Sequence, residues 1–163
     1  MRKFVVAAGI TLGILVLIMF IASLRKDELR SRLDTISQTN VTMAELSKEA
    51  ASQAGNYTLQ VTATNIAAVV TSDNQQLAVA YQTRYRKQPP QPKADEIEAL
   101  TKLKDTPSGS AYDQEYKLLV IEQLEKNLAA IKTVTNQASG QNLKDALSTG
   151  YNDQTQLLEQ LKR

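Results

Sequence analysis

The spacing of apolar residues constrains the fold of this chain more than any other feature. After residue 28 they recur every three, four or seven positions, which places them on one face of an α-helix. The apolar stripes cover residues 29–50, 59–70, 77–88, 112–134 and 143–161. Residues 59–71 are also rich in β-branched side chains that suit strands, but the length and period of the segment favour a helix. The sequence therefore predicts an all-α protein, folded as an antiparallel four-helix bundle.

Turn signals separate these stripes. Gly55 is expected to end the first helix, and Ser72 with Gln75 forms a candidate capping box that would start a new helix. The proline-rich segment 89–92 should stop that helix. A short helix with Ile97, Leu100 and Leu103 facing inward is expected before the turn at 105–109.

The first 24 residues differ from the rest. Residues 4–24 form 21 consecutive positions without a charge, which as a helix would span about 30 Å, the thickness of a bilayer core. Arg2 and Lys3 precede this segment, but it is longer than the apolar region of a cleaved signal peptide. We predict an uncleaved transmembrane signal anchor in contact with the lipid bilayer.

This interpretation divides the chain into three parts. Residues 1–24 are the basic N-terminus and anchor, residues 25–55 a membrane-proximal stalk helix, and residues 56–163 the bundle. Asn40 lies on the seam of the stalk, where a buried Asn can fix the register of a coiled coil. The stalk could therefore contact a protein partner or form a homodimer. A loosely packed connecting helix is the alternative.

Composition removes most catalytic chemistry. The 163 residues include no His, Cys or Trp, which excludes zinc fingers, thiol nucleophiles and Ser-His-Asp triads. The glycines form no phosphate-binding motif. Acidic pairs at helical spacing leave a Mg²⁺ or Ca²⁺ site of carboxylates chemically possible, although solvated helix faces also explain them. These pairs are Glu45 with Glu49 and Glu122 with Glu125. We predict a protein that is not an enzyme and holds no cofactor.

Charge argues against nucleic acid as a partner. Arg2 and Lys3 account for the net charge of +2, so the chain beyond Leu24 carries equal numbers of basic and acidic residues. A nucleic-acid binder needs a basic face.

Tyrosines are the most unusual feature of the bundle sequence. Tyr81 with Tyr85 and Tyr112 with Tyr116 are pairs four residues apart, and Tyr151 belongs to the last stripe. Their rings could line a pocket between helices, with hydroxyl groups for a small ligand. They could equally be residues at the edge of the core with hydrated hydroxyl groups.

One stretch resembles a known family. Leu100-x-x-Leu103, Gly109-x-x-Tyr112-Asp113-x-x-Tyr116 and Val120-Ile121-Glu122-x-x-x-Lys126 are similar to exported bacterial ferritin-like proteins of unknown function, often labelled predicted outer-membrane proteins. The resemblance covers residues 56–163 and implies a ferritin-like bundle. The family's histidine positions fall on Gln88, Leu124 and Gln154, so the resemblance implies no metal site here. Gln88 and Gln154 join the tyrosines as pocket candidates.

These observations predict a membrane-anchored, non-catalytic envelope or stress-associated scaffold or binding module. We expect a single-pass protein of the bacterial inner membrane with its C-terminal domain in the periplasm. Basic residues flank the anchor on both sides, and the positive-inside rule alone slightly favours the opposite orientation. Two alternatives stay open: a dimeric sensory or lysis-type module with a coiled-coil stalk, and a divalent-metal-binding protein that uses carboxylates only.

Overall fold

The protein is all-α in a computed structural model that describes the backbone from Arg2 to Arg163 and the side chains of residues 27–163. The helices are α1 (Arg2–Gln53), α2 (Tyr57–Tyr85), α3 (Glu98–Lys104), α4 (Ser110–Thr135) and α5 (Gln141–Lys162), and a 3-10 turn, η1 (Ala94–Glu96), precedes α3. The predicted all-α bundle is confirmed.

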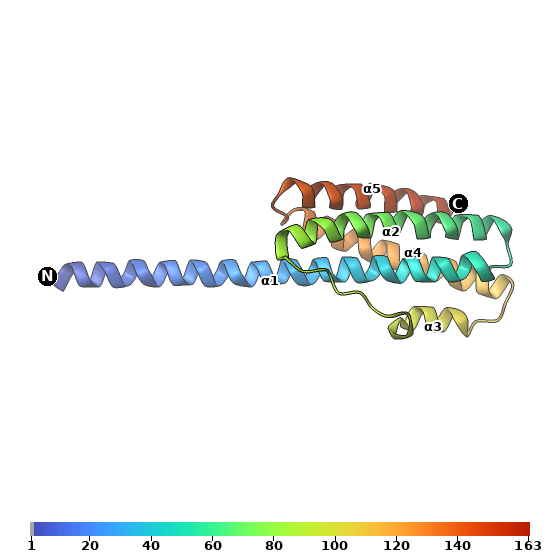
Figure 1. The fold of residues 1–163 in the computed structure, drawn as a ribbon, viewed down its shortest axis with the longest axis horizontal. Coiled ribbons are helices and arrows are strands. Elements are labelled where there is room, and N and C mark those ends of the chain that lie inside the picture. Colours follow the sequence, from blue (N-terminus) through green and yellow to red (C-terminus); the bar gives the residue numbers. More distant parts are fainter. Residues whose placement is uncertain (1) are drawn as a thin grey trace.

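Four long helices form the bundle, and each packs against two neighbours in antiparallel orientation. α1 neighbours α2 and α4, and α5 completes the square between α2 and α4 (Figure 1). Short turns join α1 to α2 and α4 to α5. One long connection, residues 86–109, runs back along the bundle so that α2 and α4 point the same way. We call the end where α1 leaves the bundle toward residue 2 proximal, and the opposite end distal.

The predicted stalk is the first helix of the bundle. We expected residues 25–55 to stand outside it, but residues 27–53 of α1 pack along α2 and α4. The apolar stripe of this segment, including Leu33, Ile36 and Leu46, is buried in the core because the other helices cover it. The seam that would join two stalks in a coiled coil is therefore occupied within one chain, and the expected boundary at residue 55 falls in the turn between α1 and α2.

α2 is one continuous helix, and the predicted break at Ser72 and Gln75 is wrong. Both side chains lie on the exposed face, while Val70 before them and Leu77 after them are buried, so packing on both sides keeps the helix intact. The true start is at Asn56, whose side chain accepts a hydrogen bond from the Leu59 backbone N–H at 3.2 Å.

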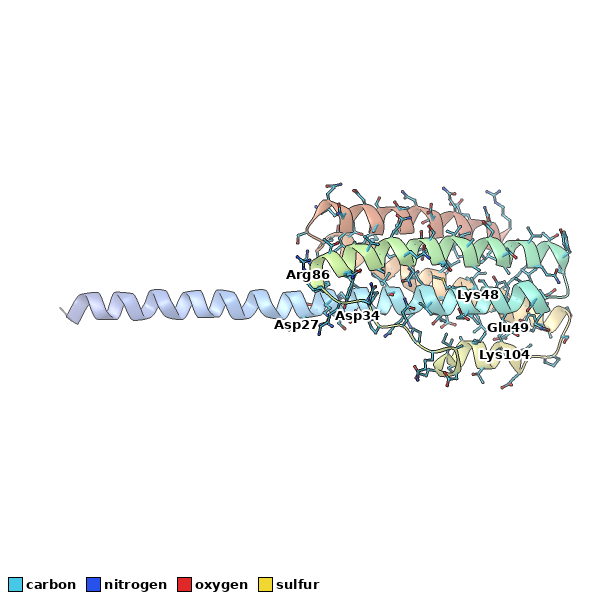
Figure 2. The ribbon with its side chains drawn as sticks, in the orientation of Figure 1. Asp27, Asp34, Lys48, Glu49, Arg86 and Lys104 are labelled. Carbon is cyan, nitrogen blue, oxygen red and sulfur yellow. The ribbon has the colours of Figure 1, made fainter. Side chains whose placement is uncertain are left out.

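The ends of the helices are tied together by a few polar contacts. At the distal end, the Gly55 backbone N–H donates to Asp113 Oδ1 at 2.9 Å, which joins the α1–α2 turn to the start of α4. At the proximal end, α2 closes at Arg86, a left-handed residue with φ 58°, and Arg84 donates to the carbonyl of Ser139 at 2.7 Å. Lys104 of α3 pairs with Glu49 of α1 at 3.7 Å (Figure 2).

Two apolar cores fill the bundle. The distal core includes Leu46, Ile66, Leu103, Tyr116 and Leu124, and residues Ile97, Leu100 and Leu103 of the α3 region cover it as predicted. The proximal core includes Leu33, Ile36, Leu77, Tyr81, Ile131 and Leu147. On every long helix, the two cores are separated by a buried polar residue.

α1 extends beyond the other helices at its N-terminal side (Figure 1). The side chains of the predicted anchor, residues 4–24, lie outside the described ones, so its insertion in a membrane stays a prediction. Across residues 27–163, no helix combines the length and apolar character that a membrane crossing requires.

Candidate functional site: a buried polar layer

Four polar side chains, one from each long helix, meet between the two cores. They are Asn40 of α1, Asp73 of α2, Asn127 of α4 and Gln154 of α5, and we call them the polar layer. All four are at least 96% buried. Each lies between distal and proximal core residues of its own helix; Asn40, for example, lies between Ile36 and Met43.

Hydrogen bonds join the four side chains into one network. Asn127 Nδ2 donates to Asn40 Oδ1 at 2.8 Å and to Gln154 Oε1 at 2.9 Å. Gln154 Nε2 donates to Asn40 Oδ1 at 3.0 Å and to Asp73 Oδ2 at 3.2 Å. Gln154 is therefore the central member, since it contacts the other three.

Asp73 is the ionisable member of the layer. Burial raises its pKa to about 6; the hydrogen bond from Gln154 opposes this rise, and the nearby Asp153 carboxyl adds to it. Gly150 lies against Asp73, and a Cβ at this glycine would contact Asp73 Oδ2 at 3.6 Å. The carboxyl group of Asp73 thus changes charge around pH 6.

The layer is not fully satisfied. Asp73 Oδ1 and Asn127 Oδ1 are buried without a hydrogen-bond partner among the described residues. A protonated Asp73 would carry one hydrogen-bond donor, whereas an ionised Asp73 leaves Oδ1 as a buried, charge-bearing oxygen that receives no hydrogen bond from residues 27–163. Next to the layer, Ser37 donates to Asn74 Oδ1 at 2.8 Å, a buried hydrogen bond that joins α1 directly to α2.

This arrangement fixes the order and register of the helices. Burial of a polar group in an apolar core costs free energy unless the group is hydrogen-bonded. A shift of one helix along another would break the hydrogen bonds of the layer and leave these polar groups unsatisfied. The layer provides one carboxyl group and three amides that bond to one another. In residues 27–163, no group of three or more acidic side chains lies close enough together to hold a metal ion.

The structure places the two predicted tyrosine pairs at opposite ends of the bundle. The ring centroids of Tyr81 and Tyr85 lie 4.7 Å apart in the proximal part, with the ring planes tilted by 48°, and the Tyr81 hydroxyl accepts a hydrogen bond from Arg30 at 3.0 Å. Tyr116 bonds to Ser47 at 3.0 Å in the distal core. Because Arg30 and Ser47 are 17 residues apart on α1, the two tyrosine pairs are separated by about 25 Å.

The environments of these tyrosines differ from that of an open pocket. Tyr112 and Tyr116 are buried, and burial raises the pKa of Tyr112 to about 12. Burial also raises the pKa of Tyr116 above its ordinary value. Tyr151 is exposed on α5. The five tyrosines therefore do not line one common site.

Of the two glutamines predicted as pocket residues, only Gln154 belongs to the polar layer. Gln88 is exposed after the end of α2 and donates to Gln82 Oε1 at 2.9 Å. The acidic pairs are engaged elsewhere: Glu45 with Lys48 at 2.6 Å, and Glu125 with Lys162 at 2.6 Å.

The sequence points to two members of the layer, Asn40 and Gln154, but gives no comparable signal for Asp73 and Asn127. Asp73 continues the stripe of Ala63, Ile66 and Val70 at helical spacing, a signal that the supposed capping box concealed. Within the apolar stripe predicted for residues 112–134, Leu128 is half-buried while its neighbour Asn127 is fully buried.

Comparisons with known proteins support the fold. No family profile matches the chain, and no curated protein matches it. Among solved structures, the chain resembles a helical bundle, CopM. CopM in its Ag-bound form aligns with a TM-score of 0.68 and 13% sequence identity, over 82% of this chain and 92% of that chain. CopM in its Cu(II)-bound form aligns with a TM-score of 0.66 and 13% identity, over 82% and 93% of the two chains.

Proposed function

We propose that this protein is a membrane-tethered, non-catalytic binding or scaffold module of the bacterial envelope, with its helical bundle in the periplasm. The observation that carries the proposal is the polar layer. It fills the centre of the bundle with side chains that bond to one another, so the outer faces are left to contact partners. Grooves on the outside support this view, such as one between α1, α3 and α4 that Gln38, Ile97 and Glu122 help to line.

The tether rests on the uncharged segment 4–24, and the one-crossover order of the long helices supports a ferritin-like bundle beyond it. The chain lacks cysteine, so a single Ser148→Cys substitution on the exposed side of α5 gives a unique label site. We expect the full chain to stay in the membrane fraction after alkaline extraction. A membrane-impermeant maleimide should label Cys at this position in intact spheroplasts.

Labelling only after lysis would overturn the periplasmic orientation. Recovery of the chain in the alkaline supernatant would overturn the tether. Wild-type protein, without cysteine, is the control for non-specific labelling.

Metal binding is the second candidate, because the CopM structures carry silver and copper. The residues of this chain do not fit such a site. Copper in proteins takes imidazole, thiolate or thioether ligands, and His and Cys are absent here. Met43, the methionine with a described side chain, is fully buried in the distal core. Among the side chains of residues 27–163, carboxylates would have to bind the ion.

A dialysis experiment separates the two candidates. We expect full-length protein equilibrated with Cu²⁺ and then dialysed to retain less than one tenth of an equivalent, with an unchanged melting temperature. Retention of one equivalent, lost in a Glu45→Gln, Glu49→Gln variant, would replace the proposal with a carboxylate metal site.

A further inference from the structure

The outer face of α2 differs from every other exposed surface of the bundle. Between Tyr57 and Thr83, the one charged residue is Asp73, and it is buried. Of the exposed positions on this helix, six define what we call the uncharged face: Tyr57, Val61, Ala68, Ser72, Val79 and Thr83. Three of them are large apolar side chains that are 77%, 52% and 66% exposed, at Tyr57, Val61 and Val79 respectively.

The spacing aligns these residues in a straight row. Tyr57, Ala68 and Val79 are eleven residues apart, and so are Val61, Ser72 and Thr83. Eleven residues make three turns at 3.67 residues per turn, close to the 3.6 of an α-helix, so the row runs nearly parallel to the helix axis. It can therefore contact a second straight helix along its full length.

The other long helices carry charges outward. Arg32 pairs with Glu28 at 2.9 Å on α1, and Lys162 of α5 pairs with Glu125 of α4 at 2.6 Å. Interfaces between proteins are depleted of charge at their centres, because a charge that loses water must find a partner. On the described surface, the uncharged face is the part that lacks charged side chains along a whole helix.

We propose that the uncharged face of α2 binds the same face of a second copy of this chain. In a two-fold interface each residue meets its own equivalent or a neighbour of it, so a charge would meet a like charge. This face has none. A strongly acidic or basic partner would find no complementary charge on it.

The predicted anchor fixes how the two copies are oriented relative to each other. This inference therefore rests on the proposed function. Two tethered copies leave the same membrane in the same direction, and a two-fold axis along the bundle would place their α2 helices parallel and side by side. The face is about 40 Å long and about 10 Å wide, which gives roughly 800 Å² for both copies. Stable dimers bury more, so the association should be weak in solution and favoured by confinement to one membrane.

Cysteine cross-linking in proteoliposomes tests the contact with the full chain. We expect Ala68→Cys, at the middle of the uncharged face, to form a disulfide-linked dimer on oxidation. Ala129→Cys, exposed on the outer side of α4, is the matched control and should give at most one tenth of that yield. Equal yields from the two positions would overturn the proposal.

A charge test examines the same contact without cross-linking. Energy transfer between copies labelled at Ser148→Cys should fall at least fivefold when both carry Ala68→Lys. It should return when Ala68→Lys copies are mixed with Ala68→Glu copies. Energy transfer that is insensitive to these charges would contradict the interface.

The two proposals fail in different ways. If alkaline extraction releases the chain, the tether is wrong and the dimer is then measured by sedimentation over a hundredfold concentration range. Dimers that Ala68→Lys abolishes would keep the interface without the tether, and monomers throughout that range would overturn the interface as well.

Discussion

The two apolar cores and the polar layer between them are equally closed to solvent, but different forces hold them. The cores are stabilised by removal of apolar surface from water, which depends little on direction. The layer is stabilised only while each donor meets its acceptor. The cores therefore supply most of the stability, whereas the layer restricts which arrangement of the four helices is acceptable.

Removal of core volume should have the largest effect. Leu124→Ala in the distal core deletes a fully buried side chain and should lower the free energy of unfolding by about 3–4 kcal/mol, measured by urea denaturation. Leu118→Ala on the same helix, at a side chain that is 64% exposed, should cost less than about 0.5 kcal/mol. Similar losses for the two variants would show that the distal core is not packed as described.

Disruption of the layer should have a smaller effect. Gln154→Met keeps the side-chain length but removes the three hydrogen bonds that centre on Gln154, so it should cost about 2–3 kcal/mol. The matched control is Gln156→Met, at an exposed position two residues later on α5, which should be close to neutral. A neutral Gln154→Met variant would mean that the layer contributes no more than an apolar contact would.

The dependence of stability on pH isolates the carboxyl group of the layer. The pKa of Asp73 is about 6 in the folded protein and near 3.8 in the unfolded chain, so folding favours the protonated form. The contribution of Asp73 to the free energy of unfolding is then fully present below pH 4, and it is lost as the pH rises through 6. The loss should be on the order of 2 kcal/mol, because ionisation must occur in a buried site.

The Asp73→Asn variant removes this ionisation. In urea denaturation it should be more stable than the wild type at pH 7.5, and its advantage should disappear at pH 4. An equal difference between the two proteins at both pH values would contradict the assignment of the raised pKa to Asp73.

The sequence predicted the helices better than it predicted their partners. The apolar period identified the buried sides of α4 and α5, and the turn at 105–109, which ends at Gly109 with positive φ, marked where α4 starts. The same period misassigned α1, since an apolar stripe does not reveal whether another chain or its own bundle covers it. The Ser72–Gln75 pair misled because a capping pattern on an exposed face has the same letters as a true helix start.

By itself, the sequence determined the helical character of this chain, most of the apolar residues that each helix would bury and the lack of imidazole and thiol chemistry, because these depend on local spacing and composition. Tertiary structure alone decided that residues 27–53 complete the bundle and that Asn40, Asp73, Asn127 and Gln154 share one level. Helical spacing gives the rotation of each helix about its own axis. The translation of one helix along another depends on the packing of all four long helices and on the length of the 86–109 connection. The sequence of a single helix does not specify either of these.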